Sequence, residues 1–131
     1  MKLYNIVSVG TSLLFVFLFA QLFFTPVSFV EGIGLQSSTA TTILCRRASM
    51  FMLGLSVLLF SVRRLPHSAM RQAICLSTGI TMTGLAILSS TELMRGRVND
   101  SMWTAIIIES ILGILFWIVY FNNLKNSTTH S

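Results

Sequence analysis

Charged residues are scarce in this chain of 131 residues: they make up 10% of it, against about 25% in ordinary soluble domains. Hydrophobic residues make up 53%, which is more apolar surface than a soluble domain of this length can bury. The length allows one domain and not two. The scarcity of charge therefore excludes an ordinary soluble protein and indicates a chain embedded in a lipid bilayer.

Cysteine and histidine are also few, and their spacing excludes the common catalytic and metal-binding motifs. Cys45 and Cys75 match neither a CxxC motif nor a zinc spacing, and we expect buried free thiols near opposite membrane faces. His67 and His130 have no ligand partner at a suitable spacing. The sequence predicts no metal site and no cofactor, and it contains no motif that fixes a reaction.

The net charge of +5 and the pI near 10 would suggest nucleic-acid binding in a soluble protein. Here the basic residues stand at the ends of apolar runs, where they meet lipid headgroups and set the orientation of the chain. No basic stripe with interleaved aromatic residues occurs. We therefore expect the lipid bilayer, and not nucleic acid, as the partner of these charges.

Four apolar runs are long enough to cross about 30 Å of hydrocarbon as helices: residues 5–24, 41–62, 70–93 and 102–121. The first run exceeds a signal-peptide core and lacks a cleavage site of small residues, so we interpret it as a retained span. Pro26 and residues 31–34 should start a loop, and the Ser/Thr-rich residues 36–42 should cap the next helix. Residues 122–131 form a polar tail that we expect to be frayed.

Most connections are short, so successive helices should be antiparallel neighbours in an all-α integral membrane bundle of four up-and-down helices. Aromatic residues at or near the span ends fit an interfacial belt: Tyr4, Trp103, Trp117 and Tyr120. A small majority of basic residues favours a cytoplasmic N-terminus and C-terminus, with these residues inside: Lys2, Arg63, Arg64, Arg71 and Lys125.

The carboxylate of Glu109 is the one acidic group placed well inside a span, about seven residues into the fourth helix. An ionised carboxylate facing lipid there would cost several kcal/mol. Ala105, Glu109 and Gly113 are spaced by four and form one stripe, whose small residues let another helix approach closely. We therefore expect Glu109 to face protein.

Arg46 and Arg47 lie at a depth similar to that of Glu109, because the second and fourth helices start at the same membrane face. Adjacent helical residues diverge by about 100°, so one arginine at most can face the carboxylate squarely. Arg47 shares a face with Gly54, and we predict a buried Glu109–Arg47 pair, with Arg46 extending toward the headgroups. The cluster either fixes the register of two helices or serves a ligand, a headgroup or a proton.

The stretch CRRASMFMLGLSVLLF at residues 45–60, followed by Arg63 and Arg64, resembles the second helix of DoxX-like and related small bacterial membrane proteins. The first-helix ending LFFTP at residues 22–26, followed by the loop with Gly32 and Gly34, is similar too. The resemblance implies a four-helix bundle in a bacterial inner membrane. DoxX proteins are associated with quinone-linked oxidation, but no residue here carries that activity over.

Two classes of function fit the sequence. The first is a non-enzymatic membrane protein: an accessory subunit with a membrane-protein partner, or a binder of a lipid or small hydrophobic molecule. The second is a small proton-coupled transporter, which at this size should be an obligate dimer. Transporters of the small multidrug type carry their essential glutamate in the first helix, which here has no carboxylate, so Glu109 could serve only by convergence.

Overall fold

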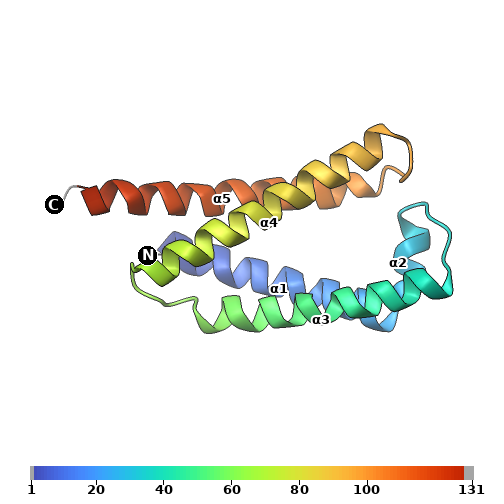
Figure 1. Cartoon of the computed structure of the whole chain (residues 1–131), viewed down its shortest axis with the longest axis horizontal. Coiled ribbons are helices and arrows are strands. Elements are labelled where there is room, and N and C mark those ends of the chain that lie inside the picture. The colour runs from blue at the N-terminus through green and yellow to red at the C-terminus, as the bar shows by residue number, and fades with distance from the viewer. Residues whose placement is uncertain (1, 129–131) are drawn as a thin grey trace.

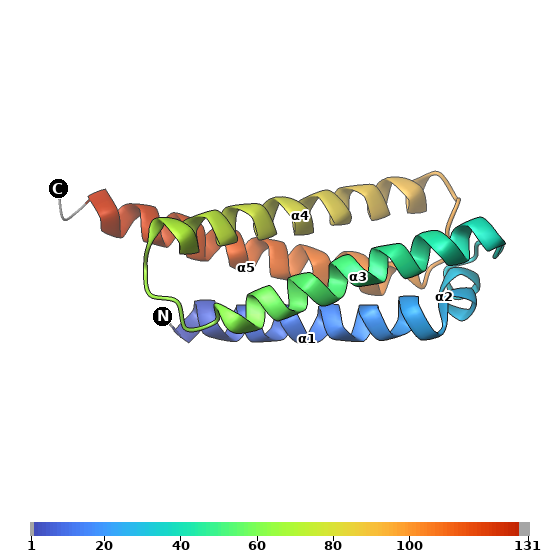
Figure 2. The ribbon, with the colours of Figure 1, turned by 60° about the horizontal axis from the view of Figure 1, so that its bottom comes forward.

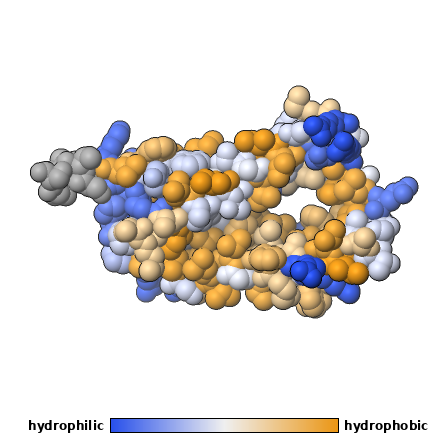
Figure 3. All heavy atoms as spheres, viewed as in Figure 1, coloured by the Kyte–Doolittle hydropathy of each residue, from blue (hydrophilic) through white to orange (hydrophobic). Residues whose placement is uncertain are grey.

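The computed structural model describes residues 2–128 and is all-helical over that range. Its five helices are α1 (Lys2–Phe24), α2 (Pro26–Gly32), α3 (Thr39–Ser61), α4 (Ala69–Met94) and α5 (Met102–Thr128). All except α2 are long and apolar enough to cross a membrane. They run up and down, and hydrophilic residues gather at the two ends of the molecule (Figures 1 and 3). The predicted membrane bundle of four spanning helices is confirmed.

The helix starts follow the hydroxyl residues that precede them. Ser38 caps α3, because its hydroxyl accepts a hydrogen bond from the Thr41 amide at 3.2 Å. The Thr41 hydroxyl in turn accepts from the Ser38 amide at 2.7 Å, which completes a capping box. Ser68 caps α4 by accepting from the Arg71 amide at 3.2 Å. The Ser/Thr-rich cap expected before the second span is therefore confirmed.

Two predicted boundaries were wrong. Pro26 does not start a loop but occupies the first turn of α2, where its missing amide hydrogen and fixed φ suit a helix. The last helix does not end near residue 121 but continues to Thr128 (Figure 1). The buried Asn123 explains the extension, because its Nδ2 donates to Oε1 of Gln72 on α4 at 3.2 Å. The last residues of the predicted frayed tail, 129–131, lie outside the described residues, as does His130.

The spanning helices form two antiparallel pairs, α1 with α3 and α4 with α5, and α1 also packs against α5 (Figures 1 and 2). The expectation that all successive helices are neighbours was wrong for α3 and α4, whose backbones do not pack together. Residues 62–68, which include Pro66, connect the first pair to the second. Figure 3 shows an opening between the two pairs toward the end that carries α2.

Small and polar residues allow close approach within each pair. Ser12 of α1 and Ser56 of α3 are buried, and each hydroxyl donates to the other residue's carbonyl oxygen at 2.8 Å. In the second pair, a Cβ atom on Gly79 would lie 3.1 Å from the Trp117 ring, and one on Gly113 would lie 3.4 Å from the Met82 Cβ atom. Gly79 and Gly113 thus allow α4 and α5 to pack closely.

The two pairs are also joined at both ends of the molecule. At the α2 end, the side-chain nitrogen of Asn99 donates to the Gly32 carbonyl oxygen at 2.9 Å. The main-chain amide of Asn99 donates to the Ile33 carbonyl oxygen at 2.8 Å. Gly34 lies against Asn99 with φ +89°, a conformation that favours glycine. At the opposite end, the buried Arg71 guanidinium of α4 stacks over the Tyr4 ring of α1, 4.3 Å from its centroid.

Candidate functional site

Glu109 faces α4, as the stripe of small residues indicated. The side chain is half-buried, and its Oε2 atom accepts a hydrogen bond from the Ser89 hydroxyl at 3.5 Å. This bond is long, so it holds the carboxylate loosely. Gly113, one turn further along the same stripe, lies against Met82 and Thr83 of α4. The helix that approaches the stripe is therefore α4 and not the predicted α3.

The structure does not bring Arg46 or Arg47 to Glu109. Both arginines are exposed on α3, and α3 does not pack against α5. The Arg46 Nε atom donates to the carbonyl oxygen of Phe23 at the end of α1, at 3.4 Å. Among the described residues, ion pairs join only Glu92 to Arg95 at 4.0 Å and to Arg97 at 3.4 Å. The predicted Glu109–Arg47 pair does not form, because residues at equal depth in the membrane can lie on helices that are not neighbours around the bundle.

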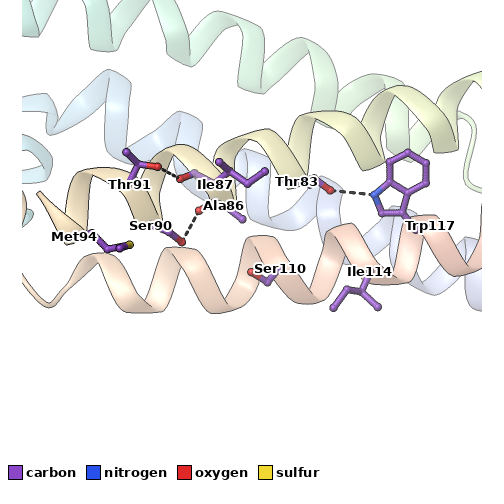
Figure 4. A pocket seen from close by; sticks show the side chains of 9 residues that line it. All are labelled: Thr83, Ala86, Ile87, Ser90, Thr91, Met94, Ser110, Ile114 and Trp117. Atoms are coloured by element: carbon purple, nitrogen blue, oxygen red, sulfur yellow. Dashed lines mark hydrogen bonds between the residues drawn. The ribbon is translucent and has the colours of Figure 1, made fainter.

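A groove of about 550 Å³ runs along the surface of the α4–α5 pair (Figure 4). Its volume lies within the range of small-molecule sites. Apolar side chains and hydroxyls line it: Thr83, Ala86, Ile87, Ser90, Thr91, Met94, Ser110, Ile114 and Trp117. Since both helices are membrane spans, this groove opens on the hydrocarbon region.

Most hydroxyls of the groove are already bonded within the protein. Ser90 donates to the Ala86 carbonyl oxygen at 2.7 Å, and Thr91 donates to that of Ile87 at 2.8 Å. Thr83 accepts from the Trp117 indole nitrogen at 3.0 Å (Figure 4). The Ser110 hydroxyl makes no hydrogen bond to another residue of the described range. The groove therefore offers a mainly apolar wall in which Ser110 is the hydroxyl without a hydrogen bond to another described residue.

Sequence analysis did not find this groove. The hydroxyls of Thr83 and Ser90 on α4 were not connected there with that of Ser110 on α5. The available signal was the run of hydroxyl residues on two spans joined by a short turn. Trp117 was assigned to the interfacial belt, but it lies well before the end of α5 and packs against Gly79.

The two cysteines and the possibility of a metal site remain to be compared with the structure. Cys45 is half-buried and Cys75 is fully buried, and both are free, as predicted. Within residues 2–128, no three His, Cys, Asp or Glu side chains lie close enough together to hold a metal ion.

Comparisons of the chain with protein-family models, curated protein sequences and solved structures find no match.

Proposed function

We propose that this protein is a non-enzymatic membrane protein that binds a lipid chain or another small hydrophobic molecule in the α4–α5 groove. The observation that carries the proposal is the groove itself, about 550 Å³ of surface hollow on two spanning helices. A mainly apolar wall that includes the unbonded hydroxyl of Ser110 suits a molecule with a long apolar body and one polar group.

The internal bonds of the other hydroxyls support an apolar occupant. Ser90 and Thr91 direct their hydrogens to carbonyl oxygens of α4 itself, so their outward surface is mainly carbon. A strongly polar ligand would find few free donors or acceptors there. An acyl chain fits the apolar part of such a groove, and the polar group at the end of that chain can pair with the Ser110 hydroxyl.

The two tryptophans of the chain provide the test. Trp117 lines the groove, whereas Trp103 is 53% exposed at the start of α5. Trp103→Phe leaves the groove tryptophan as the only one, and dibromostearate added to vesicles at a low mole fraction quenches indole fluorescence on contact. We expect saturable quenching of Trp117. Ser110→Phe, which fills the groove, should weaken the apparent affinity by about tenfold, as expected when roughly 1.4 kcal/mol of binding energy is lost.

Ile107→Phe is the matched control, because Ile107 is an exposed residue of the same helix outside the groove. It should leave the quenching curve unchanged. Quenching that rises in proportion to dibromostearate, with the same slope in both phenylalanine variants, would show contact with bulk lipid only and contradict the proposal.

A second candidate function rests on Glu109. Its carboxylate lies inside a span, contacts the Ser89 hydroxyl and has no basic partner within ion-pair distance among the described residues. Intramembrane carboxylates of this kind carry protons or cations in many transporters. A small proton-coupled transporter should purify as a dimer and acidify vesicles on substrate addition, and Glu109→Gln should abolish that proton flux. A monomeric protein without proton flux would exclude the transporter and leave binding in the groove as the proposed function.

For the location, we propose a bacterial inner membrane with both termini cytoplasmic, as the resemblance to small bacterial membrane proteins and the basic residues near α1, α3 and α4 suggest. Labelling of single cysteines at Ser37 and His67 from outside the cell tests this orientation. Labelling at Ser37 alone supports cytoplasmic termini, whereas labelling at His67 alone would place both termini outside.

A further inference from the structure

Basic residues are distributed unevenly between the two ends of the bundle. The end where α1 begins and α5 finishes, here called the basic end, carries five basic residues: Lys2, Arg63, Arg64, Arg71 and Lys125. No acidic residue lies there within the described range, because all four are in the other half of the molecule: Glu31, Glu92, Asp100 and Glu109. The whole formal charge of +5 therefore resides at the basic end.

A cavity of about 370 Å³ lies at the basic end, between the start of α1 and the residues that follow α3. Its lining combines three cationic side chains with an amide, a phenol ring and one apolar side chain: Lys2, Arg63, Arg64, Asn5, Tyr4 and Leu65. This site is separate from the α4–α5 groove, which no residue of the cavity lines.

The base of the cavity is held in place by buried contacts. Tyr4 is 1% exposed, and its hydroxyl donates to the Val62 carbonyl oxygen at 3.0 Å. The buried Arg71 stacks on the Tyr4 ring and brings a fourth positive charge behind it. Arg63 lies 3.8 Å above the Phe60 ring, and its Nη1 atom donates to the Phe60 carbonyl oxygen at 2.6 Å. These contacts orient the cavity before any ligand arrives.

Among residues 2–128, no carboxylate lies within ion-pair distance of Lys2, Arg63 or Arg64, the three cationic residues that line this cavity. The ion pairs among the described residues all involve Glu92, at the other end of the molecule. Like charges around one cavity repel one another, and an anion between them relieves that repulsion. The start of α1 adds the partial positive charge of a helix N-terminus, with Lys2, Tyr4 and Asn5 in its first turn.

We propose that the cavity binds a phosphate group, and specifically the headgroup of an anionic membrane phospholipid. Guanidinium groups pair with phosphate oxygens through several charge-assisted hydrogen bonds, and lysine adds a mobile ammonium group. The cavity lies where spanning helices begin and end, at the depth of lipid headgroups. Leu65, the apolar residue of the lining that is only half-buried, is available to the apolar part of the same lipid.

Native mass spectrometry of the whole chain in a neutral detergent tests the proposal, with phosphatidylglycerol and phosphatidylcholine of the same acyl chains as probes. We expect the protein to bind phosphatidylglycerol about tenfold more tightly. Arg63→Gln/Arg64→Gln should reduce this preference to less than about twofold, because two charge-assisted contacts are lost. Lys2→Gln, a milder change at an exposed helix start, should reduce it about threefold if the double variant does not fold.

Arg95→Gln/Arg97→Gln is the matched control, since it removes two arginines that follow α4 at the other end of the molecule. It should keep the full preference, and so should Ser110→Phe, which fills only the groove. An equal loss in the arginine control, or no preference in the unmodified protein, would overturn the site. Displacement of phosphatidylglycerol by millimolar inorganic phosphate would overturn the lipid assignment in favour of a free phosphate; retention supports the headgroup.

Discussion

The two helix pairs use the same kinds of residue in different ways. In the α1–α3 pair, the hydroxyls of Ser12 and Ser56 are buried and bond across the interface. In the α4–α5 pair, Thr83 bonds across to Trp117, but Ser90 and Thr91 bond to their own helix and line the groove. Hydroxyls that bond between helices lock a pair together, whereas hydroxyls bonded to their own helix leave a surface free for a ligand. The first pair is therefore a scaffold and the second carries the candidate site.

The largest effect should come from breaking the scaffold pair. Ser12→Leu forces a large side chain into the α1–α3 contact and removes the hydroxyl that donates to the Ser56 carbonyl oxygen, so we expect a loss of about 3 kcal/mol in unfolding free energy. Unfolding in mixed micelles of increasing denaturing detergent measures it. Ser77→Leu is the control, because Ser77 is exposed and bonds to Ala73 of its own helix at 2.8 Å. A similar loss in both variants would mean that the α1–α3 hydroxyls have no special role.

An intermediate effect is expected from the contact that holds α4 to α5. Gly79→Ala places a Cβ atom 3.1 Å from the Trp117 ring, so either the ring or the helix must shift, at a cost of about 1–2 kcal/mol. Gly84→Ala on the same helix meets no atom within 4 Å and should be neutral or slightly stabilising. Thermal unfolding in detergent compares the two variants. Equal stability would show that α4 and α5 are not in close contact at Gly79.

A smaller effect is expected from the hydrogen bonds between α1 and α3 alone. A double-mutant cycle of Ser12→Ala and Ser56→Ala isolates the contact between the two hydroxyl oxygens at 3.0 Å, because each hydroxyl's bond to a main-chain carbonyl oxygen is lost within its own single variant. We expect a coupling energy of about 0.6 kcal/mol, the average for hydrogen bonds between membrane helices. Both substitutions retain a small side chain, so the cycle separates bonding from packing. A coupling energy of zero would mean that the two hydroxyls contribute only through their separate bonds to main-chain carbonyl oxygens.

The sequence predicted those parts of the structure that depend on local chemistry. Four apolar runs gave four spans, and the hydroxyl cap before α3 was correctly located. The extension of α5 was missed because Asn123 is polar, and its bond to Gln72 depends on how α4 packs. The groove was missed for the same reason, since Ser90 and Ser110 come together only through the pairing of α4 with α5.

The smallest predicted effect on stability depends on which helices are neighbours around the bundle. Depth along the membrane normal can be counted in residues, and it correctly places Arg47 and Glu109 near the same end of the molecule. Which helices are neighbours around the bundle cannot be counted in residues, and in the structure α3 and α5 do not pack together. A double-mutant cycle of Glu109→Gln and Arg47→Gln should therefore be additive to within about 0.5 kcal/mol in unfolding free energy. Coupling above about 1 kcal/mol, with the double variant regaining stability lost by each single one, would mean that the two side chains meet and that the pairs close upon each other.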